Sequence, residues 1–154
     1  MTPLLKKLNF KEPQTAVIIN APIAFEPALA EMAKLATVEQ DPENTVSIDF
    51  AMVFVLTQAQ IEEAIASVFH KLKGDAVLWF CYPKASSKNY KCDFNRDTGW
   101  QALGKYSLEG VRQVAIDEDW SALRFRKTAY IKTLTRQESL AVSAEGKERT
   151  KKKE

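Results

Sequence analysis

The sequence has few of the residue types that most often carry catalysis or bind metals. It contains one histidine and two cysteines in 154 residues. A zinc site needs about four nitrogen, sulfur or carboxylate ligands, and a Ser-His-Asp or Cys-His arrangement would have to use His70. His70 falls about 180° from Ile61 on the solvent face of an expected helix. The sequence therefore predicts no catalytic residue, no metal site of ordinary ligands and no bound cofactor.

Glycine is also scarce, with five residues in the chain and no Gly-x-Gly pair. A dinucleotide site needs glycines after the first strand, so that backbone N–H groups can approach the phosphates. The turn at that place reads Asn20-Ala21-Pro22, and Pro22 has no N–H to donate. The usual nucleotide-binding loop is therefore excluded.

Long apolar runs and a framework of cysteines are missing too. No stretch is long and apolar enough for a membrane span or a signal peptide. The two cysteines cannot form a disulfide framework, and Cys81 lies within an apolar run, as is typical of a small core residue. The sequence therefore predicts a cytoplasmic protein with no membrane partner.

The charges nearly balance, because the formal net charge is only +2. Residues 137–154 hold five Lys/Arg and four Asp/Glu, which leaves 17 basic and 16 acidic residues in the rest of the chain. A duplex-binding domain usually shows a clear basic excess. The balance argues against a nucleic-acid partner. The composition predicts one domain over residues 1–136 and a charged, disordered tail over residues 137–154.

Two apolar runs in the middle of the chain carry the strongest structural pattern. Residues 50–56 and 76–82 are continuously apolar and too short for typical helices, so both are typical of strands buried on both faces. Between them, apolar residues recur at helical spacing from a capping box at Thr57 as far as Leu72, and we expect Gly74 to end the helix. This order predicts a right-handed βαβ unit with parallel strands.

Weaker patterns extend the unit in both directions. We expect a parallel strand at residues 15–20, a helix at 25–36, a short strand at 45–48, a helix from Asp93 or Asn95 to Tyr106, and strands at 111–116 and 121–127. The last two strands predict an antiparallel hairpin at the edge of the sheet. The fold class is thus predicted as α/β, a three-layer Rossmann-like domain with a mostly parallel sheet and a C-terminal antiparallel edge hairpin.

The carboxyl ends of the parallel strands are where such a sheet binds ligands. In this chain they carry Asn20, Thr57 and a polar, basic loop that contains Lys84, Ser86 and Ser87. Lysines and hydroxyl groups at this edge can hold a small anionic ligand. The alternative for the loop is a solvated connection without a ligand.

The terminal hairpin offers a second candidate site, an interaction surface that includes Trp120 and Arg124. The two side chains could form a cation–π pair or part of a surface patch. The alternative is that Trp120 packs with Leu123 and Phe125 onto the sheet, which would make the hairpin part of the core.

Three segments resemble a bacterial family of unknown function, family 3052. They are residues 78–87, Gly99-Trp100, and residues 114–125 with their Trp120-Ser121-Ala122-Leu123-Arg124 element. Members similarly carry a W-x-x-x-P-K segment, a polar loop and helix, and a D-E-x-W-S-x-L-R/K-F segment. The resemblance covers about residues 4–128. It implies a bacterial cytoplasmic protein and carries over no substrate or catalytic residue.

Two functions from different classes fit these observations. The order of elements resembles a shortened methyltransferase-like Rossmann fold that lacks the acidic and glycine-rich first motif. An intact core with a missing nucleotide loop favours a non-catalytic domain that binds a small anionic ligand or a protein partner. The alternative is a degenerate methyltransferase-like enzyme with an atypical cofactor site near Asn20 and Thr57. The sequence favours the binding domain and leaves enzymatic activity open.

Overall fold

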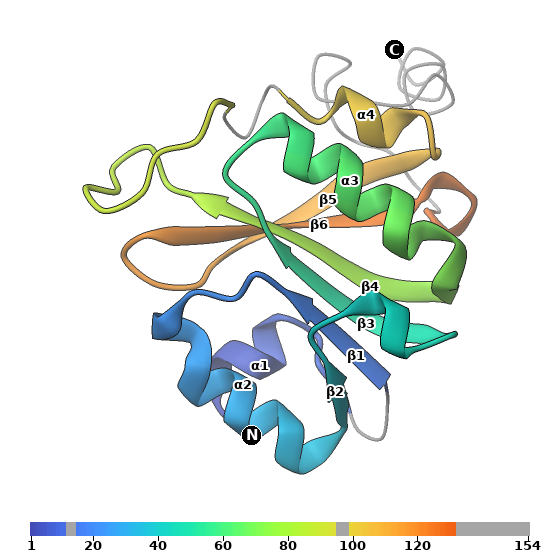
Figure 1. Ribbon diagram of the computed structural model, residues 1–154, viewed down its shortest axis with the longest axis horizontal. Coiled ribbons are helices and arrows are strands. Elements are labelled where there is room, and N and C mark those ends of the chain that lie inside the picture. The colour runs from blue at the N-terminus through green and yellow to red at the C-terminus, as the bar shows by residue number, and fades with distance from the viewer. Residues whose placement is uncertain (12–14, 95–98, 132–154) are drawn as a thin grey trace.

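The computed structural model describes residues 1–11, 15–94 and 99–131 of the chain (Figure 1). The strands are β1 (Thr15–Ile19), β2 (Thr37–Glu39), β3 (Ile48–Phe54), β4 (Leu72–Pro83), β5 (Leu108–Ala115) and β6 (Trp120–Lys127). The helices are α1 (Pro3–Lys7), α2 (Glu26–Leu35), α3 (Gln58–Val68) and α4 (Gln101–Gly104). Short 3-10 turns are η1 (Ile23–Phe25), η2 (Pro42–Asn44), η3 (Phe69–Lys71) and η4 (Thr128–Tyr130).

The six strands form one sheet in the order β2-β1-β3-β4-β6-β5. β1, β2, β3 and β4 run parallel, and β6 lies antiparallel between β4 and β5. The predicted α/β class is confirmed, including the mostly parallel sheet and the C-terminal antiparallel hairpin at its edge.

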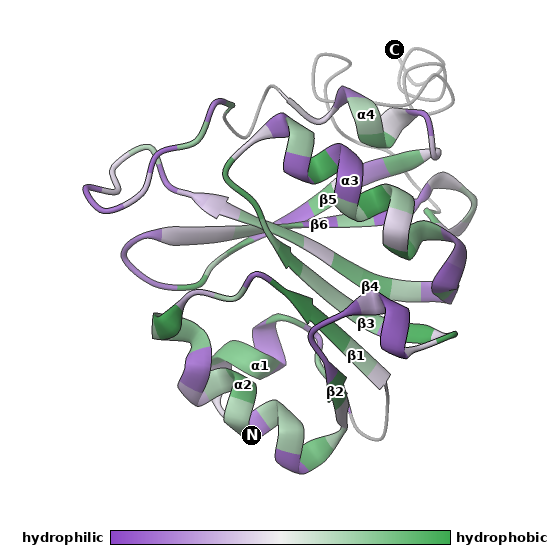
Figure 2. Cartoon of the chain, in the orientation of Figure 1, coloured by the Kyte–Doolittle hydropathy of each residue, from purple (hydrophilic) through white to green (hydrophobic). Residues whose placement is uncertain are grey.

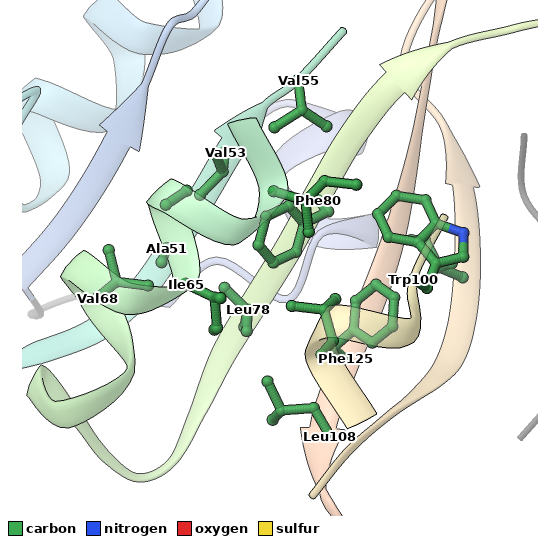
Figure 3. Packing of buried hydrophobic residues seen from close by; sticks show 14 of the residues in the cluster. Ala51, Val53, Val55, Ile65, Val68, Leu78, Phe80, Trp100, Leu108 and Phe125 are labelled. Carbon is green, nitrogen blue, oxygen red and sulfur yellow. The ribbon is translucent and has the colours of Figure 1, made fainter. Parts of the chain in front are cut away.

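Helices cover the two faces of the sheet, which gives the three expected layers (Figure 1). On one face, α3 and α4 bury Ile61, Ile65, Val68 and Leu103 against the strands. Figure 3 shows the centre of this cluster, where the rings of Phe80, Trp100 and Phe125 lie close to one another. The other face is covered by α1 and α2, which bury Leu5 and Met32 among other side chains.

The central strands are the most apolar part of the molecule. Figure 2 shows β1 and β3 as largely hydrophobic, whereas the helices show a mixture of hydrophobic and hydrophilic residues. Residues Phe50 to Phe54 of β3 are all buried, because helices lie on both faces of this strand. Within the part of the chain that the structure describes, no helix is both long and apolar enough to cross a membrane.

The predicted βαβ unit is present, but its helix is shorter than expected. The capping box at Thr57 begins α3, whereas α3 ends at Val68 and Leu72 is already the first residue of β4. Leu72 fits the helical spacing of apolar residues, although it is not in the helix, because β4 buries it in the same apolar cluster as the residues of α3. Gly74 therefore does not end the helix; it lies within β4 at φ 54°, where the pairing with β3 is irregular.

Several weaker predictions need correction. Residues 37–39 form the edge strand β2, which the sequence did not predict, whereas of the strand expected at 45–48 only Ile48, the first residue of β3, is in a strand and residues 45–47 are irregular. Of the helix expected to reach Tyr106, the described residues show the four residues of α4, which ends at Gly104. The proposed cap at Asn95 and the tail at 137–154 lie outside the described residues.

Candidate functional site

The chain reverses its direction across the sheet between β1 and β3. From β1 it crosses to β2 on one side, and then returns past β1 to β3 on the other side. The helices that follow these two strands, α2 and α3, lie on opposite faces. Ligands in open α/β sheets bind at such a switch point, outside the carboxyl ends of the strands.

A cavity of about 360 Å³ opens at this switch point. We call it the switch-point cavity; its lining residues are Ile19, Asn20, Asp41, Pro42, Glu43, Gln60, Glu63, Ala64 and Ser67. They come from the end of β1, from η2 and from α3. The volume is within the range of about 300–1,000 Å³ that is usual for small-molecule sites.

The lining of the switch-point cavity is acidic. Asp41, Glu43 and Glu63 contribute carboxylates, and none of the described lining residues is a lysine or an arginine. The Lys71 ammonium group donates a hydrogen bond of 2.6 Å to the Pro42 carbonyl, which holds η2 beside α3. The cavity therefore favours a ligand with positive charge or hydroxyl groups over a phosphate.

Asn20 reaches the cavity from a left-handed turn. Its φ is 57°, a conformation that glycine adopts freely and that asparagine tolerates better than most other residues. The turn after β1 thus keeps a glycine-like backbone without a glycine. Pro22 follows as the residue before η1, and its ring nitrogen cannot donate to a ligand.

This turn gives a direct test. Replacing Asn20 with alanine is expected to lower the free energy of unfolding by about 1 kcal/mol, because the new side chain lacks the local hydrogen bonding that eases a positive φ. Replacing it with glycine is expected to change the free energy of unfolding by only a few tenths of a kcal/mol. Urea denaturation measures both; equal losses in the two variants would show that the conformation of the turn is not the cause.

Thr57 has a structural role at the same edge. Its hydroxyl oxygen accepts a hydrogen bond of 3.1 Å from the Gln60 N–H, and the Gln60 amide oxygen accepts one of 3.2 Å from the Thr57 N–H. Gln60, the partner in this capping box, lines the switch-point cavity, whereas Thr57 does not. The capping box was visible in the sequence and could have indicated Gln60, in place of Thr57, as a candidate site residue.

A second cavity, of about 580 Å³, lies at the carboxyl end of β4. We call it the β4-end cavity; its lining residues are Tyr82, Pro83, Lys84, Ala85, Ser87, Tyr90, Lys91, Cys92, Phe94, Gln113 and Ser121. Lys84 and Ser87 of the predicted anion site are among them, and Ser86 is not. The predicted site residues therefore do not form one site: Asn20 lines the first cavity, Lys84 and Ser87 line the second, and Thr57 and Ser86 line neither.

The loop that follows β4 is held by Asp119 in the turn between β5 and β6. The Lys84 N–H donates to the Asp119 carbonyl at 2.8 Å, and the Ser87 hydroxyl donates to Asp119 Oδ1 at 2.8 Å. The Asn89 amide donates to Asp119 Oδ2 at 3.2 Å. The proton of Ser87 is thus engaged in fixing the loop, which is a role that the sequence did not predict.

Trp120 and Arg124 do not form the predicted interaction surface. Trp120 is only 4% exposed, and its ring lies 5.2 Å from Phe54 and 4.9 Å from Tyr90. It belongs to the core, as the alternative prediction had it. Arg124 is half-buried and lines a polar cavity with Lys11 and other residues. Burial lowers the pKa of Arg124, and the neighbouring charge of Arg126 lowers it further.

No protein-family model matches this chain, and no curated protein matches it by sequence. Its fold does match solved structures. A SAM-dependent methyltransferase from Aquifex aeolicus superposes with a TM-score of 0.62 at 11% identity, over 81% of this chain and 88% of that chain. The chain has a methyltransferase-like Rossmann fold.

Two further methyltransferases are similar to the chain. The tRNA methyltransferase TrmK of B. subtilis has a TM-score of 0.51 at 11% identity, over 93% of this chain and 74% of that chain. A ribosomal-protein methylase from Lactobacillus delbrueckii subsp. bulgaricus has a TM-score of 0.50 at 11% identity, over 80% of this chain and 77% of that chain. At these identities the likeness shows the fold alone. The resemblance to family 3052 stays a prediction.

S-adenosylmethionine is the cofactor named for the Aquifex aeolicus methyltransferase, and the switch-point cavity lies where Rossmann-like folds bind ligands and carries acids that suit a positive charge. This cofactor carries no phosphate, so the missing glycine-rich loop does not exclude it. Its sulfonium, its ammonium group and its ribose diol can each contact a carboxylate, and its own single carboxylate still leaves the molecule with a net positive charge. Asp41 follows Asn20 by 21 residues, close to the spacing at which Rossmann folds place the acid that binds ribose hydroxyls. No cluster of metal-ligating side chains is found among the described residues.

Proposed function

We propose that this chain is a methyltransferase-like domain that binds S-adenosylmethionine in the switch-point cavity. One observation carries the proposal: an acid-lined cavity lies at the switch point of a fold that is shared with methyltransferases. The solved structures support this alternative over the non-catalytic domain that the sequence favoured, although only at the level of the fold.

The lining residues would contact different parts of the ligand. Asp41, which caps η2, and Glu43 within it would hold the ribose hydroxyl groups, since carboxylates accept strong hydrogen bonds from hydroxyl donors. Glu63 on α3 would attract the positive charge of the ligand. Asn20 would approach the ligand from the turn after β1, and Ile19 and Ala64 supply apolar contact. When bound, this cofactor supplies an electrophilic methyl group.

The proposal predicts that S-adenosylmethionine binds and that the acids determine the affinity. Asp41→Asn and Glu63→Gln are each expected to raise the dissociation constant about tenfold or more, because each removes one charge-assisted contact worth about 1.5–3 kcal/mol. Asn at position 41 keeps an oxygen that can accept the hydrogen bond now made by the Glu43 N–H at 2.9 Å. The change therefore alters the charge and leaves η2 capped. Isothermal titration calorimetry measures the affinity.

Glu62 provides the matched control for Glu63. It is the preceding residue of α3, it is exposed, and it does not line the cavity. Glu62→Gln is expected to bind the cofactor like the parent chain. Absence of binding at millimolar S-adenosylmethionine would rule the proposal out, and so would an affinity that stays the same in both the Asp41 and the Glu63 variant.

A further inference from the structure

The β4-end cavity differs in chemistry from the switch-point cavity, although both open at the carboxyl edge of the sheet. Three aromatic side chains, Tyr82, Tyr90 and Phe94, line it. Two of them contact each other, since the rings of Tyr82 and Phe94 lie 6.1 Å apart. A wall of this kind offers contact to a flat, apolar ligand surface.

The charged groups of the β4-end cavity are both cationic. Lys84 and Lys91 line it, and no aspartate or glutamate does so among the described residues. Neither ammonium group has an ion-pair partner in residues 1–11, 15–94 and 99–131. The two lysines are therefore available to bind an anion, whereas a cation would meet positive charge.

The structure holds this cavity in a defined shape. The hydrogen bonds from Lys84, Ser87 and Asn89 to Asp119 fix the loop that carries both lysines (the yellow-green loop in Figure 1). On the opposite side, the Gln113 amide donates a hydrogen bond of 2.9 Å to the Tyr82 hydroxyl oxygen. Because the walls are already ordered, a ligand loses less free energy in ordering them.

We propose that the β4-end cavity binds a small aromatic carboxylate. The aromatic side chains contact the ring of the ligand, and Lys84 and Lys91 bind its carboxylate. This refines the anion site predicted around Lys84 by adding the ring-binding wall and Lys91. The proposal is independent of cofactor binding, since the two cavities have no lining residue in common.

Cys92 gives a readout located in the cavity. It lines the β4-end cavity and is partly exposed, whereas Cys81 is fully buried, with its thiol pKa raised by burial. Iodoacetamide should therefore alkylate Cys92 and spare Cys81. We expect 2-naphthoate to slow the alkylation of Cys92 severalfold at saturation. Intact-protein mass spectrometry follows the reaction, and Cys92→Ser identifies the modified residue.

Two analogues and four variants separate charge from shape. Acetate has the charge alone and 2-naphthylmethanol has the ring alone, so both should protect Cys92 much less than 2-naphthoate does. Lys84→Ala and Lys91→Ala should each raise the dissociation constant of 2-naphthoate about tenfold. Lys88→Ala, in the same loop but outside the cavity, should leave it unchanged, and so should Asp41→Asn.

Three results would overturn the proposal. The first is no protection of Cys92 by millimolar 2-naphthoate, and the second is equal protection by 2-naphthylmethanol. The third is parental affinity in both the Lys84 and the Lys91 variant. Lys91 is exposed, so its variant keeps the test valid even where Lys84→Ala disturbs the loop. If the chain binds 2-naphthoate but does not bind S-adenosylmethionine, the proposed function is rejected and the proposal for the β4-end cavity stands.

Discussion

Replacing Trp120 with alanine is expected to lower the free energy of unfolding by about 3–5 kcal/mol. Trp120 is 4% exposed and begins β6. Its ring packs between Phe54 of β3 and Tyr90 of the loop after β4. The substitution would leave a cavity between the sheet and this loop. Such a loss is a large share of the roughly 5–15 kcal/mol that stabilises a typical domain.

Urea denaturation followed by circular dichroism measures this effect. Ile23→Ala is the matched control, since it also removes a large apolar side chain, but from a residue that is 83% exposed. It is expected to change the free energy of unfolding by less than about 0.5 kcal/mol. If Trp120→Ala unfolds at the same urea concentration as Ile23→Ala, the hairpin does not contribute to the core as described.

The central part of the fold could be predicted because its signals are local. The apolar runs of β3 and β4 reflect burial on both faces, and the capping box at Thr57 is read within four residues. β2 could not be predicted in the same way. It has three residues, none of them fully buried, so its pairing with β1 is determined by the sheet and not by its own pattern.

In β6, side chains on both faces of the sheet are at least partly buried. The alternation of β6 placed Leu123 and Phe125 in the core correctly, and both are buried with α3 and α4. The same alternation would point Arg124 away from that cluster, toward solvent. In the structure Arg124 is half-buried, because its face of β6 is also partly covered. Trp120 and Ala122 on that face are buried in the same apolar cluster as Leu5 and Met32.

The candidate sites could be predicted only in part. The rule for parallel sheets led to Asn20 and Lys84, which each line a cavity. The acids of the switch-point cavity carried no such signal, because exposed acids in a turn and on a helix are typical of solvated surface. They come together only through the packing of η2 beside α3, which includes the bond from Lys71 to Pro42. The contact of Ser87 with Asp119 spans 32 residues and has no local pattern either.

Gly99→Ala is expected to lower the free energy of unfolding by about 2–5 kcal/mol and to disturb the β4-end cavity. Gly99 has a φ of 91°, and a Cβ atom there would lie 2.5 Å from Phe94 Cβ and 2.9 Å from Phe94 Cγ. The alanine is therefore strained in its backbone and collides with a buried ring. Phe94 lines the β4-end cavity and packs 5.0 Å from Trp100, so a displaced Phe94 changes the shape of the cavity.

Gly74→Ala separates backbone strain from collision. Gly74 also has a positive φ, of 54°, but its nearest neighbour would be the Tyr130 hydroxyl oxygen at an ordinary 3.8 Å. It is expected to cost only about 1–2 kcal/mol. In the double variant Gly99→Ala/Phe94→Gly the collision is absent, because glycine at position 94 removes the Cβ atom as well as the ring, so the loss should be smaller than the sum of the two single losses. Urea denaturation measures all four variants, and the alkylation rate of Cys92 reports the cavity. Additive losses would mean that Phe94 is not what excludes a side chain at Gly99.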